Sequence, residues 1–277
     1  MSETGPRALI ITAPGINCDL ELARAFEAAG AHPESHLLRE LMRTPSIIDR
    51  FDLIGLPGGF SYGDDVAAGR IMAQLIRRSI LPALHEAVKR RVPMICPCNG
   101  FQIAVQAGLL PSFEGGSAAL PVVALAENLD ARFHDRWTRI EVPDETICLW
   151  TRGLQFDQET GLLPSAHGEG RFVAPASVLD ALECAGQVAM RYAEGENFNG
   201  SERRIAGICD PTGLILGLMP HPERYTRWTQ HPWWTRLDPG VRQHETPGLA
   251  IFRNAVDWVR RGRPSHTSST KGLAPCR

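Results

Sequence analysis

The sequence lacks an apolar run long enough to cross a membrane, and it has almost no excess of charge. Its formal net charge is −2 over 277 residues, with 29 basic and 31 acidic residues interspersed, so no strong field favours nucleic acid or an anionic membrane. The short polar start, residues 1–7, does not have the architecture of a signal peptide. We therefore expect small molecules or other proteins as partners, and no nucleic acid or membrane.

Cysteine is present, but not in the arrangement of a disulfide framework. The seven cysteines are an odd number without a recurring spacing, which favours a reducing compartment. No second cysteine or histidine pair lies at the spacing of metal ligands, so no metal is predicted. We expect a cytosolic protein.

The first half of the sequence alternates apolar β-type runs with helical patterns. Strands are predicted at 8–13, 51–56 and 92–97, and helices at 19–29, 66–90 and 99–108. The apolar runs are continuous, as in strands covered on both faces. This alternation predicts a doubly wound α/β fold with a parallel sheet.

The second half has shorter β-type segments that we expect to extend the same sheet. Strands are predicted at 138–142, 187–192, 204–209 and 214–219, and helices at 176–185 and 249–261. The stretch 224–248, rich in Trp, Pro, His and Arg, is predicted to be a long ordered loop. Residues 1–261 are predicted to form one domain, followed by a disordered tail at 262–277.

Cys98 is the strongest candidate for a nucleophile. It lies where the apolar strand ending at Pro97 gives way to a helix that opens with Asn99 and Gly100. Such a turn presents the sulfur at the carboxyl edge of the sheet, and the helix N-terminus favours the thiolate. The alternative is that Cys96 and Cys98 are simply small core residues.

His221 and Glu223 are the candidate base and its orienting carboxylate. They lie in the segment M-P-H-P-E-R at 219–224, directly after an apolar strand. Pro222 disfavours the α conformation at His221, and in an extended segment positions i and i+2 project to the same side, so the two side chains can hydrogen-bond. A solvated turn is the alternative. Together with Cys98, the pair predicts a Cys-His-Glu triad.

Three further segments contain glycine beside polar residues. Gly58 and Gly59, after the strand at 51–56, predict an oxyanion hole, with a structural turn or a phosphate loop as alternatives. Residues 14–19 serve either as a helix cap or in substrate binding. Residues 166–172, with His167 and Gly168, predict a ligand or partner site, or else a glycine-rich hairpin.

These motifs occur in the order P-G-x-N-C-D, P-G-G-F-S-Y-G-D, C-N-G-F-Q, A-H-G-E-G-R-F and G-L-M-P-H-P-E-R. In this order they closely resemble the glutaminase subunit of phosphoribosylformylglycinamidine synthase, a class I glutamine amidotransferase of purine biosynthesis. The resemblance covers roughly residues 8–224. The segment N-F-N-G-S at 197–201 is similar to the family's N-P-N-G-S, with Phe198 in place of proline.

The resemblance implies a flavodoxin-like amidotransferase fold, with helices on both faces of a mostly parallel sheet. It implies that Cys98 forms a glutamyl thioester, that N–H groups near Gly59 and at Asn99 hold the oxyanion, and that Gln102 helps to bind glutamine. Ammonia would pass to a separate synthetase subunit that uses ATP and magnesium, usually with a small bridging subunit. No cofactor is expected on this chain.

One departure from the family motivates a competing function. The family usually has glycine where this chain has Cys96, and a side chain there could crowd the elbow or the oxyanion hole. The alternative is therefore a catalytically silent structural or regulatory subunit of the same complex. A stand-alone cysteine hydrolase of the DJ-1-like type shares the elbow and the sheet. A flavin-binding flavodoxin-like module is disfavoured, because no phosphate loop follows the first strand.

Overall fold

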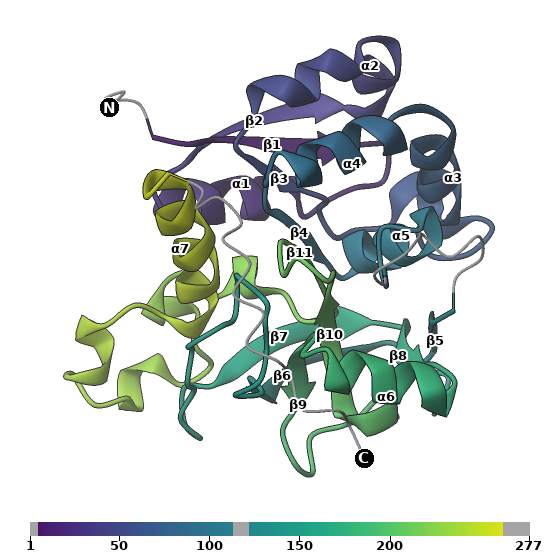
Figure 1. Ribbon diagram of the computed structural model, residues 1–277. Coiled ribbons are helices and arrows are strands. Elements are labelled where there is room, and N and C mark those ends of the chain that lie inside the picture. The colour runs from purple at the N-terminus through teal and green to yellow at the C-terminus, as the bar shows by residue number, and fades with distance from the viewer. Residues whose placement is uncertain (1–4, 113–121, 263–277) are drawn as a thin grey trace.

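A nine-stranded sheet forms the centre of the computed structural model, which describes residues 5–112 and 122–262 (Figure 1). The strands lie in the order β2-β1-β3-β4-β11-β10-β9-β6-β7. They are β1 (Arg7–Thr12), β2 (His32–Leu37), β3 (Leu53–Gly55), β4 (Met94–Pro97), β6 (His134–Glu141), β7 (Leu162–His167), β9 (Val188–Tyr192), β10 (Ile205–Cys209) and β11 (Ile215–Leu218). A second, two-stranded sheet contains β5 (Ala124–Glu127) and β8 (Glu169–Val173).

The strands from β2 to β11 in this order are parallel, and beyond β11 each strand is antiparallel to its neighbour. Consequently β9 and β7 point the same way as the parallel strands, whereas β10 and β6 point the opposite way. The predictions of a mostly parallel α/β sheet and of later strands that extend it are confirmed. The carboxyl ends of the parallel strands meet at one edge, where such sheets bind ligands.

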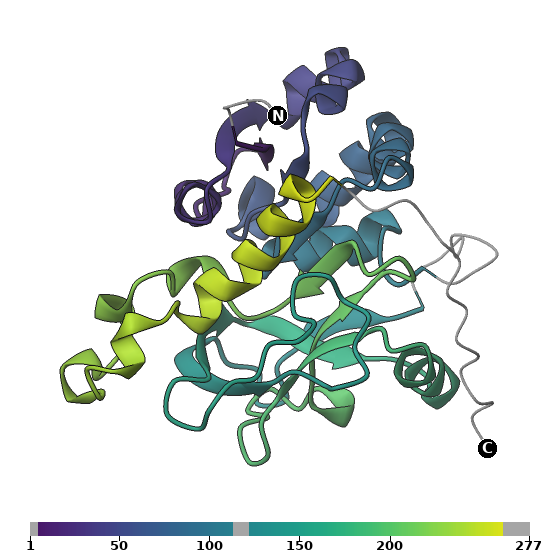
Figure 2. The same cartoon turned by 60° about the vertical axis from the view of Figure 1, so that its left-hand side comes forward.

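Helices cover both faces of the sheet (Figures 1 and 2). The α-helices are α1 (Asp19–Ala28), α2 (Leu38–Arg43), α3 (Arg70–Ser79), α4 (Leu81–Lys89), α5 (Asn99–Ala107), α6 (Ala176–Cys184) and α7 (Pro247–Arg260). One hydrophobic core contains side chains of α2 to α6, and the other contains those of α1 and α7. No helix in residues 5–112 and 122–262 is long and apolar enough to span a bilayer.

Strand β1 illustrates why the buried strands are continuously apolar. Leu9 and Ile11 pack in the core under α2 to α6, whereas Ala8 and Ile10 pack in the core under α1 and α7. Successive side chains of a strand point to opposite faces, so a strand covered on both faces needs apolar residues at every position. This is the physical reason that the sequence pattern identified the central strands.

Several elements differ from the sequence predictions, and α2, β5, β7 and β8 were not predicted at all. The helical pattern at 66–90 is divided into α3 and α4, with Pro82 in the first turn of α4. Strand β2 was not predicted, because it is a partly exposed edge strand of sequence H-P-E-S-H-L that pairs only with β1. An edge strand whose outer backbone groups and side chains face solvent does not need the apolar pattern of a central strand.

The stretch 224–248 is the ordered loop that the sequence predicts. It contains the short 3-10 helices η5 (Trp228–Gln230), η6 (Trp234–Arg236) and η7 (Val241–Gln243). Tyr225 anchors it: the side chain is buried, and its ring centroid lies 5.1 Å from that of Trp137 on β6. The predicted disordered tail lies outside the described residues, apart from Gly262.

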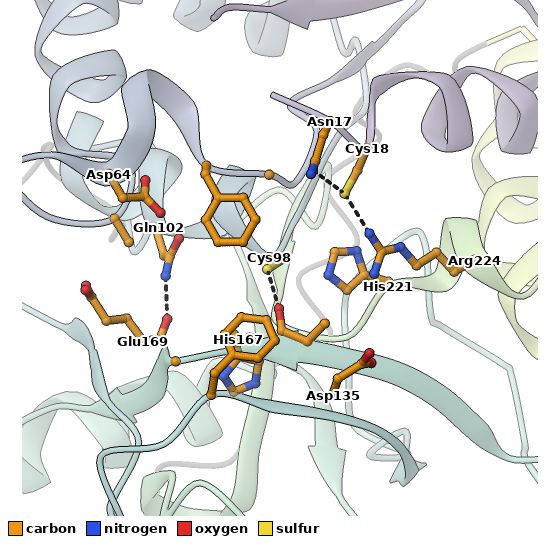
Figure 3. Close-up of a pocket in the computed structure, with 16 residues that line it drawn as sticks. Asn17, Cys18, Asp64, Cys98, Gln102, Asp135, His167, Glu169, His221 and Arg224 are labelled. Atoms are coloured by element: carbon orange, nitrogen blue, oxygen red, sulfur yellow. Dashed lines mark hydrogen bonds between the residues drawn. The ribbon is translucent and has the colours of Figure 1, made fainter. Parts of the chain in front are cut away.

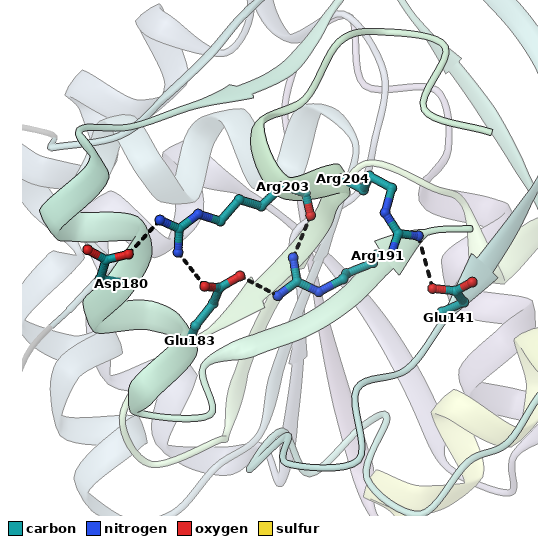
Figure 4. A network of polar contacts seen from close by, with 6 residues as sticks. All are labelled: Glu141, Asp180, Glu183, Arg191, Arg203 and Arg204. Carbon is teal, nitrogen blue, oxygen red and sulfur yellow. Dashed lines mark hydrogen bonds and ion pairs between the residues drawn. The ribbon is translucent and has the colours of Figure 1, made fainter. Parts of the chain in front are cut away.

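A polar network attaches α6 and the turn after β9 to the sheet (Figure 4). The guanidinium of Arg203 pairs with Asp180 at 2.5 Å and with Glu183, both on α6. Glu183 also pairs with Arg191 of β9 at 2.6 Å, and Arg204 pairs with Glu141 of β6 at 3.0 Å. Because one carboxylate serves two guanidinium groups, helix, turn and strand are held together.

Candidate active site

Cys98 lies at a sharp turn between β4 and α5. Its φ of 51° and ψ of −111° are unusual for a residue with a side chain. Its N–H donates to the carbonyl of Leu218, the last residue of β11, at 2.7 Å. Its side chain lines a cavity of about 340 Å³ (Figure 3). The predicted elbow is therefore present, and its sulfur lies in the cavity wall.

Gly100 is required by the close approach of two elements. A methyl group on Gly100 would lie 2.0 Å from the carbonyl oxygen of Leu56, just after β3. No side chain fits at that distance, so only glycine lets the first turn of α5 pack against the end of β3. The small residue after Cys98 therefore sets the position of the elbow relative to the glycine loop that follows β3.

His221 and Glu223 form a buried pair beside this elbow. Nδ1 of His221 lies 2.6 Å from Oε1 of Glu223, and the two residues are only 1% and 2% exposed. The N–H of His221 donates to Pro164 on β7 at 2.7 Å. The predicted contact is present, but the predicted extended segment is wrong. His221 is outside the α region, whereas Pro222–Arg224 form the 3-10 turn η4, which brings Glu223 to the imidazole.

The environment of His221 favours its protonated form. Burial by itself lowers the pKa of His221, but the Glu223 carboxylate and the Cys98 sulfur raise it to about 10. An imidazolium between a carboxylate and a sulfur holds the arrangement of a Cys-His-Glu triad. Cys98 and His221 converge because β4 and β11 are parallel neighbours, with Pro97 opposite Leu218.

The glycine loop after β3 fits closely against these side chains. A methyl group on Gly58 would lie 2.9 Å from Cε1 of His221 and 3.4 Å from Cβ of Cys98. Gly59 has a φ of 137°, which side chains rarely adopt, and it lines the cavity. The predicted loop is therefore adjacent to the triad, as an oxyanion hole requires, and its role in holding an oxyanion stays a prediction.

Asn99 and Gln102 connect the loop to α5. The Asn99 side chain accepts the N–H of Ser61 at 3.2 Å and donates to Gln102 at 2.8 Å. Gln102 in turn donates to the carbonyl of Glu169 on β8. Gln102 lines the cavity, whereas the side chain of Asn99 holds the loop in place.

The edge strand β7 reaches the site although three strands separate it from β11 in the sheet. The Sγ of Cys98 lies 3.6 Å from the carbonyl oxygen of Ala166 on this strand. His167 and Gly168 follow and line the cavity. The alternative of a glycine-rich hairpin at 166–172 is wrong, because β7 and β8 pair in different sheets.

His167 is buried and neutral. Burial and the nearby charge of His221 lower its pKa to about 3. Its Nδ1 lies 3.1 Å from Oδ1 of Asn128, and its Nε2 has no hydrogen-bond partner among the described residues. With Nδ1–H donating to Asn128, the buried Nε2 of the neutral imidazole is an acceptor.

Several lining residues were not predicted as site residues. They include Phe60, Asp64, Phe133, Asp135, Glu169 and Arg224. Some lie within motifs that the sequence analysis quoted, but Phe133 and Asp135 have no sequence signal. They come to the cavity because β6 pairs with β7, with His134 opposite His167.

The segment 14–19 contributes Asn17 and Cys18 to the cavity. Cys18 is the N-cap residue of α1, but its side chain makes no capping hydrogen bond. Its sulfur instead lies 3.0 Å from Nη2 of Arg224, which also pairs with Glu21 at 3.5 Å. Burial, followed by the charge of Glu223, raises the pKa of Cys18 to about 12, against the opposing effect of Arg224. Cys18 is therefore a neutral thiol beside His221 and Glu223.

Comparison with known proteins agrees with this geometry. Residues 5–259 match the model of the CobB/CobQ-like glutamine amidotransferase domain. The chain is 38% identical to phosphoribosylformylglycinamidine synthase subunit PurQ of Dehalococcoides mccartyi, over 92% of this chain and 98% of that protein. The corresponding subunit of Methanococcus maripaludis is 33% identical, over 94% and 100%. The chain belongs to the PurQ family of glutamine amidotransferases.

A solved structure supports the same conclusion. The structure of PurLQS from Thermotoga maritima contains a chain with 29% sequence identity and a TM-score of 0.67. The similarity covers 92% of this chain and 99% of that chain. The fold of that chain therefore agrees with that of this chain over nearly the full length.

Cys96, at a position where the resemblance leads us to expect glycine, does not enter the cavity. Its side chain is fully buried with Met94 and Phe101 in the core under α2 to α6. The residue opposite it on β11 is Gly217, at which a methyl group would lie 2.2 Å from the Phe101 ring. The space beside Cys96 is therefore filled by an aromatic ring, and Cys98 still reaches the cavity.

The N-F-N-G-S segment at 197–201 of this PurQ-family chain is hydrogen-bonded to β8 beside the site. The side chain of Asn199 donates to Gly170 at 2.9 Å, and the hydroxyl of Ser201 accepts the N–H of Phe172 at 3.0 Å. Phe198, at a position where the resemblance leads us to expect proline, packs its ring 5.4 Å from that of His167. The segment therefore holds both β8 and His167 in position.

Proposed function

We propose that this chain is the glutaminase subunit of phosphoribosylformylglycinamidine synthase and that Cys98, His221 and Glu223 are its catalytic triad. The observation that carries the proposal is the convergence of the Cys98 elbow and the buried His221–Glu223 pair on one cavity. Membership of the PurQ family supports it, because the relatives named above are subunits of this synthase.

The reaction starts with attack by the Cys98 thiolate on the side-chain amide carbon of glutamine. The carbon–sulfur bond forms, and the carbonyl oxygen takes the negative charge. N–H groups near Gly59 and at Asn99 hold this oxyanion, since donors fixed before the reaction stabilise developing charge most effectively. The glycine loop lies against Cys98 and His221, which supports this assignment.

His221 then acts as the acid. It gives its proton to the amide nitrogen, the carbon–nitrogen bond breaks, and ammonia leaves a glutamyl thioester on Cys98. Neutral His221 next removes a proton from water, which attacks the thioester and releases glutamate and the thiolate. Glu223 stabilises the imidazolium through the 2.6 Å contact in each cycle.

The cavity has the charges that suit the amino-acid end of glutamine. Asp64, Asp135 and Glu169 line it, and these carboxylates favour an α-ammonium group. Gln102, which also lines the cavity, offers an amide group for hydrogen bonds to the α-carboxylate or the side-chain amide of glutamine. The mixture of charges favours a zwitterionic substrate over an apolar one.

Ammonia must leave through the mouth of the cavity, so the synthetase has to cover it. Phe60 and Phe133 are exposed and line the cavity, and three further exposed apolar residues, Leu20, Val66 and Leu129, lie within four positions of lining residues in the sequence. Exposed apolar patches on soluble proteins mark interaction sites. We assign this surface, called the mouth patch, to the synthetase.

The remaining parts of the reaction belong to the partner proteins. The synthetase uses ATP and magnesium to convert formylglycinamide ribonucleotide into its amidine with the ammonia supplied here. A small bridging subunit completes the assembly. Five of the six cysteines that the structure describes, Cys18, Cys96, Cys98, Cys148 and Cys209, have free thiols, whereas Cys184 is disulfide-bonded. This excess of free thiols favours a cytosolic location.

The test is intact-mass analysis after reaction with a glutamine-like diazo ketone, on the chain alone and with the synthetase. We expect one adduct in the wild type and in Cys96→Ala, and none in Cys98→Ala. The absence of an adduct in both states would refute the enzymatic function and favour the silent structural subunit. Turnover of glyoxals without turnover of glutamine would favour the stand-alone hydrolase.

A further inference from the structure

Cys18 is a buried nucleophilic side chain that the proposed reaction does not use. It follows β1, whereas His221 and Glu223 follow β11, and the fold brings all three together. The Cys18 sulfur, one ring nitrogen of His221 and a carboxylate oxygen of Glu223 lie within 4.8 Å of one another. All three residues are almost completely buried.

Glu223 supplies an independent indication of a ligand. Its Oε1 contacts His221, but its Oε2 is buried and has no hydrogen-bond partner among the described residues. A buried carboxylate oxygen without a partner is costly, and the cost is removed when a cation binds it. The cavity gives access, because Cys18 and His221 both line it.

We propose that Cys18, His221 and Glu223 form a binding site for a divalent metal ion of the zinc class, and that the ion inhibits the glutaminase. A thiolate, an imidazole and a carboxylate with one water complete a four-coordinate zinc site. The inhibition rests on the proposed function, because the ion would bind the catalytic base and the carboxylate that orients it. The binding of the ion does not depend on the proposed function.

The charges around the site are compatible with a divalent cation. The Cys18 thiolate and the Glu223 carboxylate neutralise the ion, and the ion replaces the protons of the thiol and of the imidazole nitrogen. The Arg224 guanidinium opposes the cation, since it lies 3.0 Å from the Cys18 sulfur. The nearby carboxylate of Glu21 pairs with this guanidinium and offsets its charge.

The ligand types select the metal. Sulfur and imidazole donors favour zinc, cobalt and cadmium over magnesium and calcium, which prefer oxygen. Donor atoms in a tetrahedral zinc site lie about 3–4 Å apart, and the donor atoms here lie within 4.8 Å of one another, so shifts of about 1 Å close the site. The sequence analysis predicted no metal, because spacing patterns detect only ligands that are close together in the sequence. Cys18 is far from the other two ligands: it lies 206 positions before Arg224, the residue that follows Glu223.

Cobalt provides a readout that is independent of activity, because a thiolate bound to cobalt has a strong near-ultraviolet charge-transfer absorption. We expect this absorption on titration of the full chain with Co²⁺, for the wild type and for Cys98→Ala. It should be lost in Cys18→Ala and in Cys18→Ser, which keeps the side-chain size. Glu223→Gln should weaken binding at least tenfold, and Cys96→Ala serves as the control for a buried cysteine outside the cavity.

Inhibition is then measured on glutamine hydrolysis by the complex with the synthetase, in zinc-buffered solutions. The zinc concentration for half-inhibition, taken relative to each variant's own metal-free rate, should rise at least tenfold in Cys18→Ser. A chelator should restore the wild-type rate. Absorption that persists in Cys18→Ser but disappears in Cys98→Ala would overturn the proposal, because the ion would then be bound to the nucleophile. Cobalt binding by Cys98→Ala requires no glutaminase activity. Failure of the metal-site proposal can therefore be distinguished from failure of the proposed glutaminase function.

Discussion

Nδ1 of His221 lies 2.6 Å from Oε1 of Glu223, and both residues are almost completely buried. A buried ion pair is costly to break from one side, because the remaining charge is left without its partner. The pair therefore defines the protonation state of His221 and, through it, the chemistry available to Cys98.

Replacing Glu223 by glutamine should lower kcat for glutamine hydrolysis by about 10²–10⁴-fold, since the amide cannot stabilise the imidazolium. The substitution keeps the size of the side chain, so the variant is expected to fold. An unchanged melting temperature and retained diazo-ketone binding would confirm that it does. Glu34→Gln on the edge strand β2 is the matched control and should retain full activity. A Glu223→Gln enzyme with the wild-type rate would remove Glu223 from the triad.

Replacing Gly58 by alanine should lower activity by about 10²-fold, because a displacement of about 1 Å at reacting groups has an effect of this size. The added methyl group would lie 2.9 Å from Cε1 of His221. In Gly168→Ala the nearest atom is 3.8 Å away, on Phe133, so a much smaller loss is expected. Steady-state kinetics of both variants test this difference, and equal losses would contradict the steric explanation.

His167 should make the protein acid-sensitive. Its pKa of about 3 in the folded state lies below the ordinary value of 6.5, so the unfolded chain binds the proton more strongly between these values. The free energy of unfolding should therefore fall as pH decreases from about 6.5 towards 3, by at most about 1.4 kcal/mol per pH unit.

Urea unfolding of the wild type and of His167→Gln between pH 7 and 4 measures this contribution. The variant should lose less stability than the wild type over this range. The exposed His32→Gln serves as control and should behave like the wild type. Parallel pH profiles for all three proteins would show that His167 is not the source of the sensitivity.

The mouth patch should be required for assembly with the synthetase. Leu129→Glu combined with Val66→Glu introduces charge at two exposed positions outside the cavity. We expect at least tenfold weaker binding to the synthetase by isothermal titration, with the diazo-ketone adduct on Cys98 retained. Met42→Glu on α2 is the control for an exposed apolar residue elsewhere.

The loop at 224–248 offers a different surface, where Trp233 and Trp234 are exposed. If Trp234→Glu weakens binding to the synthetase and the Leu129→Glu/Val66→Glu double variant does not, the synthetase binds at this loop. The assignment of the mouth patch would then be wrong.

The sequence determined the parts of this protein whose signal is local. Continuous apolar runs identified the central strands, since each of these residues contacts a core on one face or the other. Cys98 and His221 could be recognised because each directly follows such a strand. The parallel pairing of β4 and β11 then places them side by side. Motif order identified the family, and the comparisons confirmed it.

Only the tertiary structure decided which residues join this pair. The sheet brings its edge strand β7 back to the site, where Ala166 contacts Cys98 and His167 completes the wall. The structure also brings Cys18 to His221 and replaces the predicted extended segment with a 3-10 turn. These contacts join residues far apart in the chain, or depend on the dihedral angles of one turn. A residue pattern records burial and local conformation, whereas such contacts depend on how the complete sheet twists and packs.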